Sequence, residues 1–252
     1  MTALRLLTER GARGPDPECV MAREYATTHG IEVVETWTKA MQKGLLAVTP
    51  HDVAIGSIPF VHQRLRSSGA KPPLPNDYPE SVREFLHREV TRTTLREARV
   101  DIDEYGKGLF VKPATKLKRF TGFVANFAYD HRFNGAGGRT EVWVSNPVNF
   151  VSEWRVYSVG GDVLAVGSAP SNPSDPSMPN RDVIDEIAQR LYEMPAGFAG
   201  LCFDVGVLDT GQTALVEVNE GYGFGAYEGC TPEALWAVNV ARQRQIVAYG
   251  PV

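Results

Sequence analysis

The segments FDVGVL (203–208) and LVEVNEGYGFGAY (215–227) decide how this chain is interpreted, because apolar residues dominate both and a short polar turn joins them. This pattern predicts two paired strands. Asp204 stands among apolar neighbours in the first strand, and Glu217 and Asn219 share one face of the second. Two carboxylates and a carboxamide converging from paired strands suit Mg²⁺, which takes oxygen ligands from protein, phosphates and water. Solvated acids on an edge hairpin are the alternative, which is disfavoured because carboxylates embedded in apolar strands need partners.

A lysine ends an earlier apolar strand at Lys112, and a basic loop with Lys116 and Lys118 follows it, closed by Thr121 and Gly122. Cations at a strand end beside a flexible Thr-Gly turn suit a polyphosphate, because the lysines offset its charge and loop amides approach its oxygens. The Walker A pattern G-x-x-x-x-G-K-[ST] is absent from the sequence, so the loop is not a P-loop. A solvated basic hairpin loop is the alternative.

Glu153 and Arg155 stand two residues apart and therefore face the same side of an expected strand. In a cleft, a ligand hydroxyl on Glu153 and a phosphate on Arg155 would satisfy both charges. A cross-strand ion pair on the surface would do so as well. The glycine-rich tract 221–227 would let the backbone approach a ligand closely, although a tight structural turn is the commoner explanation.

Sequence patterns argue against several other chemistries. The five histidines show no short metal-binding spacing such as H-E-x-x-H, and the cysteines form no C-x-x-C. No G-x-S-x-G elbow of a serine hydrolase is present, and no G-x-G-x-x-G follows the early strands. We therefore expect neither a zinc enzyme nor a dinucleotide fold.

Composition indicates a globular protein. Of 252 residues, 43% are hydrophobic and 22% charged, and the formal net charge of −4 gives no electrostatic footprint for nucleic acid or anionic lipid. No run of about 18 apolar residues predicts a membrane helix, and the first residues lack the pattern of a signal peptide. Three widely spaced cysteines indicate free thiols in a reducing compartment. We expect a cytoplasmic protein that binds neither nucleic acid nor membrane.

The residues up to 78 are expected to form a small α/β unit with a parallel sheet. Asp16 can cap a helix that has Pro17 at its first position and ends near Gly30, and strands are expected at 31–35 and 52–55. A further helix is expected through Phe60, Val61 and Leu65. The Pro-rich stretch 71–79 is a candidate linker.

After the linker, the apolar spacing of Val82, Phe85, Leu86 and Val90 predicts a helix that opens near Pro79, and Thr94 with Glu97 has capping-box spacing. Strands then dominate, and the body is expected to be α+β and rich in antiparallel strands. Expected strands are 109–111, 123–127, 141–144, 155–159, 163–166, 201–208 and 214–218, with helices through Ile184–Leu191 and from Pro232. Residues 168–180, which carry four prolines, are expected to form a long exposed loop.

The order of these motifs resembles the ATP-grasp superfamily, and more narrowly its clade named for one arginine and two lysines. The match is carried by VKPATKLKRFTGFV (111–124), EVWVSNPVNFVSEWRVYSV (141–159) and the two segments quoted first; GSIPFV (56–61) and DYPESVREFLHREV (77–90) resemble the lead-in. The resemblance implies an ATP-grasp fold of three parts: an N-terminal α/β lobe (1–78), a small lobe with the phosphate loop (79–148) and a C-terminal lobe with the metal site (149–252). The last two would sandwich ATP.

The resemblance also implies roles for individual residues. Lys112 and Lys118 would hold the phosphates, with Lys116 as the substitute if the loop register shifts, and Thr121 and Gly122 would close over them. The backbone from Ser145 to Val148 would read adenine, Glu153 would meet the ribose, Arg155 would stabilise the transferred phosphoryl group, and Asp204, Glu217 and Asn219 would ligate Mg²⁺. Two positions depart from the superfamily pattern. Cys202 stands where many members have arginine, and Ser145 stands where an acidic residue is usual, with Glu141 as the alternative.

The activity that the resemblance implies is an ADP-forming carboxylate–amine ligase, or a thiol ligase, that uses ATP and Mg²⁺. Its partners would be small carboxylate and amine substrates, with amino acids and peptides as candidates, and a homodimer is compatible with the superfamily. An ATP-grasp kinase and a non-catalytic nucleotide-binding domain are the alternatives.

Overall fold

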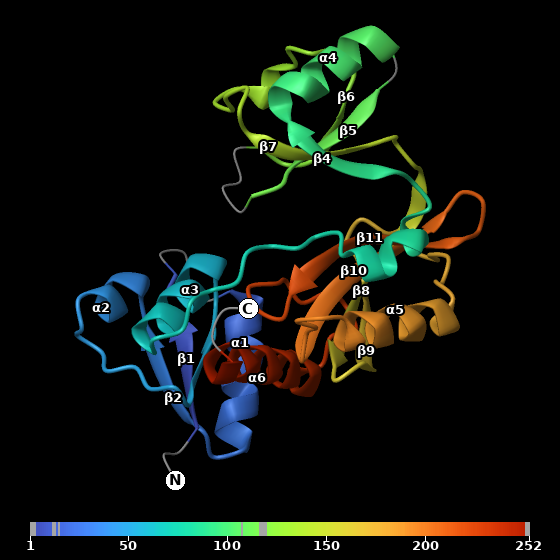
Figure 1. Ribbon diagram of the computed structural model, residues 1–252. Coiled ribbons are helices and arrows are strands. Elements are labelled where there is room, and N and C mark those ends of the chain that lie inside the picture. Colours follow the sequence, from blue (N-terminus) through green and yellow to red (C-terminus); the bar gives the residue numbers. More distant parts are fainter. Residues whose placement is uncertain (1–3, 12–13, 15, 107, 116–119, 250–252) are drawn as a thin grey trace.

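The computed structural model describes residues 4–11, 14, 16–106, 108–115 and 120–249. Their strands form three sheets, which we call the N-terminal, central and C-terminal sheets (Figure 1). Helices accompany each sheet, so the expected α/β and α+β class is confirmed.

The N-terminal sheet is parallel, with the order β2-β1-β3. Its elements alternate along the chain: β1 (Arg5–Glu9), α1 (Pro17–Thr28), β2 (Glu32–Thr36), α2 (Thr38–Gln42), β3 (Asp52–Ile55) and α3 (Ile58–Ser67). Leu6 and Leu7 of β1 are buried on opposite faces, the first among residues of α1 and the second among residues of α3. Because β1 is central, the strand order reverses at its carboxyl end, where open α/β sheets commonly place ligands.

The central sheet is antiparallel, with the order β4-β7-β5-β6. Its elements are β4 (Val90–Thr94), α4 (Leu95–Tyr105), β5 (Leu109–Pro113), β6 (Phe123–Ala125), the 3₁₀ turn η2 (His131–Phe133) and β7 (Glu141–Ser145). The predicted capping box opens α4: the Thr94 side chain accepts from the Glu97 backbone N–H, and the Glu97 carboxylate accepts from that of Thr94. Leu95 and Ile102 of α4 then pack in the hydrophobic core of this sheet.

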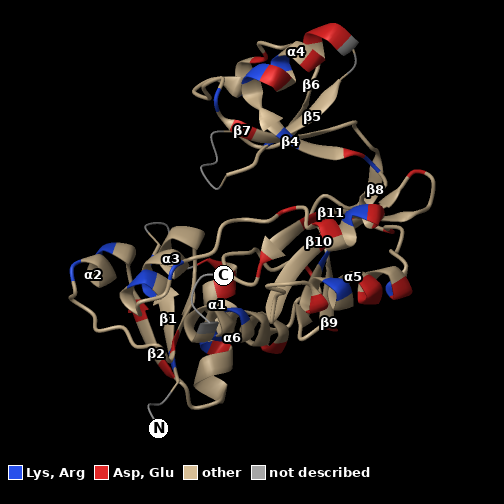
Figure 2. Cartoon of the chain, in the orientation of Figure 1, with Lys and Arg blue, Asp and Glu red and all other residues tan. Residues whose placement is uncertain are grey.

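The C-terminal sheet is antiparallel, with the order β11-β10-β8-β9. Its strands are β8 (Phe150–Val159), β9 (Asp162–Ser168), β10 (Gly200–Leu208) and β11 (Thr213–Glu220). The helix α5 (Arg181–Glu193) and the 3₁₀ helix η1 (Glu80–Leu86) pack on one face, where Trp154 and Phe203 are buried. Strand alternation places Arg155 and Asp204 on the other face, which α6 (Pro232–Tyr249) partly covers. Acidic and basic residues alternate along α5 (Figure 2), as is typical of a solvent-facing helix surface.

Helix α6 ties the N-terminal and C-terminal sheets together. It contacts β8 and β10 of the C-terminal sheet as well as α1 and β3 of the N-terminal sheet. In Figure 1 these two sheets lie side by side, and the central sheet stands apart above them. The division into 1–78, 79–148 and 149–252 is kept as a proposal, in which the last segment also packs on the first.

The structure corrects the helix that was predicted to open near Pro79. Residues 80–86 form a 3₁₀ helix, and His87 ends it with a left-handed backbone at φ 48°. Val90 belongs to β4 and is buried in the same core as Val82, Phe85 and Leu86. The helical spacing therefore came from burial against the C-terminal sheet, which a 3₁₀ helix followed by a strand satisfies as well as an α-helix would. Strands β1 and β4 and the short helix α2 were not predicted.

Candidate functional site

A cleft of about 580 Å³ lies between the central and C-terminal sheets and reaches the N-terminal unit at Ile58. Eight of the predicted site residues line it: Lys112, Thr121, Gly122, Glu153, Arg155, Asp204, Glu217 and Asn219. They come from segments up to 107 residues apart in sequence, and the three-part fold brings them together. The expectation of solvated surface acids does not describe them, because Arg155 and Asp204 are 8% and 6% exposed.

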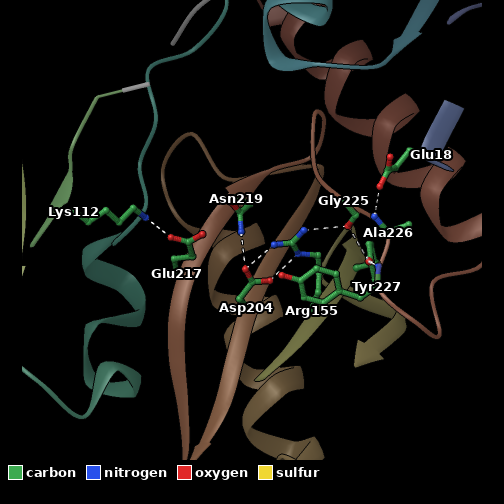
Figure 3. Close-up of polar contacts among 10 residues, drawn as sticks. Glu18, Lys112, Arg155, Asp204, Glu217, Asn219, Gly225, Ala226 and Tyr227 are labelled. Carbon is green, nitrogen blue, oxygen red and sulfur yellow. Dashed lines mark hydrogen bonds and ion pairs between the residues drawn. The ribbon is translucent and has the colours of Figure 1, made fainter. Parts of the chain in front are cut away.

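Arg155, Asp204 and Glu217 occupy opposed positions on three neighbouring strands. The register pairs Asp204 of β10 with Arg155 of β8 on one side and with Glu217 of β11 on the other. Arg155 Nε donates to Asp204 Oδ1 and Nη2 donates to Oδ2, both at 2.8 Å. Asn219 Nδ2 also donates to Asp204 Oδ2, at 3.2 Å (Figure 3). Both oxygens of this carboxylate are thus engaged within the protein.

Lys112 reaches the same face from the central sheet. Its Nζ forms ion pairs with Glu217 and, at 2.7 Å, with Asp77 Oδ2 (Figure 3 shows the first of these). Asp77 lies in the linker before η1, and its backbone oxygen accepts from Val218 N of β11 at 2.9 Å. The lysine ammonium therefore connects the central sheet to two carboxylates of the other parts of the cleft.

Burial and charge set the pKa values in the cleft. Burial opposes the charge of Lys112, but Glu217 and Asp77 outweigh it and raise the pKa of the ammonium above its ordinary value. Burial raises the pKa of Asp204 even though the Arg155 guanidinium favours its ionised form. Burial also raises the pKa of Glu153, and the charges of Asp204 and Glu217 add to that effect. The site therefore concentrates negative charge that its own cations only partly offset.

The glycine-rich tract 221–227 forms one wall of the cleft. Arg155 Nη1 donates to the Gly225 oxygen at 3.0 Å, and the guanidinium lies 4.2 Å from the centre of the Tyr227 ring. From the other side, Glu18 Oε1 of α1 accepts from Ala226 N at 2.6 Å (Figure 3). Gly223 needs to be glycine, since its φ is +64° and a Cβ there would lie 2.6 Å from the Ile58 side chain. The tract is thus a fixed wall held from two parts of the protein.

The Thr-Gly turn lies against β5. A Cβ on Gly122 would come within 2.9 Å of the Phe110 ring and 3.2 Å of Lys112 Cβ, so a larger residue would push the turn away from the lysine. Lys116 and Lys118, the other predicted phosphate-binding residues, lie outside the described residues.

The predicted adenine segment occupies the connection between the two sheets. Ser145 is the buried last residue of β7, and Val148 lies between β7 and β8. Neither is among the described residues that line the cleft. Glu141, the acidic alternative, forms an exposed ion pair with Arg92 at 2.8 Å.

Sequence reasoning missed three residues at this site. Asp77 was read as part of a linker, and no local pattern marks it as a partner of Lys112. Glu18 was explained by its place in the first turn of α1. Tyr227 belonged to a tract whose aromatic residues were expected to line a pocket, which was the available signal.

The donor set suits Mg²⁺. Asp204, Glu217 and Asn219 supply two carboxylates and one carboxamide oxygen at the same end of β10 and β11, facing one cavity. No group of three or more His, Cys, Asp and Glu residues suited to a metal occurs in the described part of the chain, which is consistent with a set completed by an amide. The bonds of Asp204 to Arg155 mean that a cation would share this carboxylate with the guanidinium or displace it.

Family comparison defines the class to which this fold and site belong. A family model described as an ATP-grasp domain, family 2 of the clade named for one arginine and two lysines, matches residues 85–238, which is more than half of the chain. The chain therefore belongs to the ATP-grasp domain family. Within it, the chain is a member of family 2 of that clade, and the resemblance inferred from its motifs is confirmed.

Solved structures with the same fold cover almost the whole chain. The RimK domain ATP-grasp protein from Sphaerobacter thermophilus is 15% identical, with a TM-score of 0.56 over 96% of this chain and 99% of that one. D-alanyl-alanine synthetase A from Vibrio cholerae is 13% identical, with a TM-score of 0.53 over 97% and 100%. The ATP-grasp ligase PsnB, bound to a variant of its minimal precursor, Mg and ADP, is 12% identical, with a TM-score of 0.51 over 96% and 99%. At these identities the likeness establishes the fold.

Two further comparisons are brief. No curated protein matches the chain. Among the residues that the structure describes, no helix combines the length and the apolar character needed to cross a membrane.

Proposed function

We propose that this protein is an ATP-dependent ligase that activates a substrate carboxylate as an acylphosphate, releases ADP, and joins the acyl group to an amine. The observation that carries the proposal is the convergence of Lys112, Glu153, Arg155, Asp204 and Glu217 on one cleft between two sheets. Membership of the ATP-grasp family supports the use of ATP. The names of two neighbours of the same fold, a synthetase and a ligase, support the reaction type.

The chain's residues would bind and orient the reactants. Lys112 and the Thr121–Gly122 turn would hold the phosphates, Glu153 would accept a hydrogen bond from a ribose hydroxyl, and Asp204, Glu217 and Asn219 would hold Mg²⁺. When bound, Mg²⁺ would supply positive charge that offsets the phosphate oxygens. Arg155 would face the phosphoryl group in transfer, since it lies beside the carboxylates and is kept charged. Phosphoryl transfer depends mainly on such positioned charge.

The proposed reaction has two steps. A carboxylate oxygen of the first substrate bonds to the γ-phosphorus while the bond to the bridging oxygen of ADP breaks. The amine nitrogen then bonds to the acyl carbon, the carbon–oxygen bond to phosphate breaks, and the nitrogen loses a proton to a base. Water must be excluded between the steps, because it would hydrolyse the acylphosphate.

A smaller cavity next to the cleft supports an amine as acceptor. It has a volume of about 180 Å³ and shares Gly223, Phe224 and Gly225 with the cleft. Among the described residues that line it, the charged ones are Asp16 and Glu18. An amine that enters as an ammonium ion would be attracted to these carboxylates and would lie within reach of the cleft past Gly225.

Nucleotide turnover tests the proposal. Purified protein is supplied with Mg²⁺-ATP and a pool of amino acids and small carboxylic acids, and ADP, AMP and phosphate are resolved, with Glu217→Ala as the control variant. We expect ADP and free phosphate to form in equal amounts, dependent on the pool and on Glu217. The pool can then be divided to find the substrates.

Other products would contradict the ligase. ADP without free phosphate would indicate a kinase, because the phosphate would remain on the acceptor. AMP would rule out the acylphosphate route. ATP binding without turnover by any pool would favour a nucleotide-binding domain that does not catalyse.

A further inference from the structure

Strand β8 loses its neighbour at Glu153. On that edge, β9 pairs with β8 from Val159 down to Trp154, whose partner Ser168 is the last residue of β9. The backbone N–H and oxygen of Glu153 would therefore lack strand partners at the edge, and buried backbone groups need them. The position matters because the Glu153 side chain lines the cleft.

The side chain of Asn172 takes the place of the missing strand residue. Its Oδ1 accepts from Glu153 N at 2.8 Å, and its Nδ2 donates to the Glu153 oxygen at 2.7 Å. Nδ2 also donates to Ser168 Oγ at 2.9 Å, which links the carboxamide to the end of β9. A carboxamide carries the same donor and acceptor pair as a peptide group, so it can complete the ladder for one residue.

The loop around Asn172 is bound to β8 at further points. Ala169 N donates to the Glu153 oxygen at 3.0 Å. On the opposite face of the strand, the Ser177 oxygen accepts from Ser152 Oγ at 2.6 Å and from Trp154 Nε1 at 3.0 Å. The Pro-rich loop 169–180 therefore wraps the edge of β8 on both sides of Glu153.

Glu153 needs such a restraint. Its carboxylate is partly buried and is repelled by the charges of Asp204 and Glu217, so the side chain alone would favour moving out of the cleft. Hydrogen bonds to its backbone oppose that movement without occupying the carboxylate. The oxygens stay free for a ligand.

We propose that Asn172 is a positioning residue of the nucleotide site, which fixes the Glu153 backbone so that the carboxylate meets the ribose hydroxyls. The inference rests on the proposed function, because it takes Glu153 as the ribose-binding residue. It assigns a role in nucleotide selection to the loop 169–180.

Calorimetric binding tests the inference without turnover. The dissociation constants of ATP and of 2′,3′-dideoxy-ATP, which lacks both ribose hydroxyls, are measured in Mg²⁺ for the wild type, Asn172→Ala, Glu153→Ala and the double variant. Ser174→Ala, an exposed residue of the same loop, is the matched control. Thermal unfolding of each variant shows whether it remains folded.

We expect the wild type and Ser174→Ala to bind ATP about tenfold or more tightly than the dideoxy analogue, as a hydrogen bond to a charged group can provide. Asn172→Ala should lose most of this preference, Glu153→Ala all of it, and the double variant should equal Glu153→Ala. A preference retained in Asn172→Ala would overturn the inference, and so would equal weakening of both nucleotides, which would indicate a general structural role. A wild type that binds ATP without preference would overturn the role of Glu153 and this inference while leaving the ligase intact. A wild type that fails to bind ATP would overturn both.

Discussion

Arg155 holds Asp204 through two parallel hydrogen bonds of 2.8 Å, from directly opposed positions on β8 and β10. The proposed phosphoryl-binding cation and a proposed metal ligand thus neutralise each other in the protein without nucleotide. Lys112 and Glu217 form a second pair of the same kind. Binding of Mg²⁺ and ATP together can exchange these partners with little change in the charge of the cleft, whereas either alone would leave a buried charge unmatched.

Replacement of Arg155 by alanine should depress turnover more than nucleotide affinity. We expect kcat to fall about 100-fold or more, as happens when a preorganised charge on a transition state is lost, and the Kd for ATP to change far less. Steady-state kinetics and calorimetry measure the two effects. Arg155→Lys, which keeps the charge but loses the two-point contact with Asp204, should lie between. Unchanged turnover with equal ATP binding in Arg155→Ala would refute the role.

Replacement of Asp77 by asparagine should strengthen ATP binding. Asp77 competes with a bound phosphate for the Lys112 ammonium, and the asparagine keeps the backbone bond to Val218. We expect the Kd for ATP to decrease about threefold or more, since removing a competing carboxylate frees part of the cation's interaction energy. The same titration on Asp162→Asn, at an exposed site on β9, should give the wild-type Kd. Weaker binding by the Asp77 variant would mean that Asp77 assists the nucleotide.

Replacement of Gly225 by alanine should obstruct the passage between the two cavities. A Cβ at this position would lie 3.5 Å from Glu18 Oε1 and 3.6 Å from Arg155 Nη1, which are ordinary contacts that the fold can accommodate. Once the acceptor is known from the pool assay, its KM should rise about tenfold or more, because misplacement of a nucleophile by a methyl group is costly. The Kd for ATP should change little. An unaltered KM would place the acceptor elsewhere.

Replacement of Asp52 by asparagine should destabilise the N-terminal sheet in a pH-dependent way. Burial would raise the pKa of Asp52, but hydrogen bonds from Arg5 and Thr49 lower it below its ordinary value of 3.8. Such a carboxylate stabilises the fold above its unfolded pKa, and that contribution is lost as the pH falls through the lower folded value. We expect a loss of about 2 kcal/mol in unfolding free energy at pH 7.

The pH series provides the check on Asp52. Chemical denaturation of the wild type and Asp52→Asn from pH 7 to pH 3 should show the difference between them shrinking below about pH 4. A difference that stays constant across this range would mean that the ion pair with Arg5 is not its cause.

Much of the fold could be predicted because its signals are local. The capping box at Thr94 and Glu97, the proline at the first position of α6 and the hairpin of β10 and β11 each involve neighbours in sequence. The 3₁₀ helix at 80–86 was mistaken for an α-helix because apolar spacing reports burial, and burial against the C-terminal sheet can be met by more than one backbone form. Strand β1 is short, and its identity depends on the two strands that flank it.

The sequence by itself determined the family and the residue types of the site, since Lys112, the pair Glu153 and Arg155, and the acids of β10 and β11 follow strand alternation. Tertiary structure alone decided which charges meet. Asp77 reaches Lys112 from a linker, Glu18 reaches the Gly225 wall from α1, and Asn172 completes β8 beside Glu153. These contacts join segments whose separation along the chain carries no periodic signal, because side-chain proximity there is set by how the sheets and loops pack.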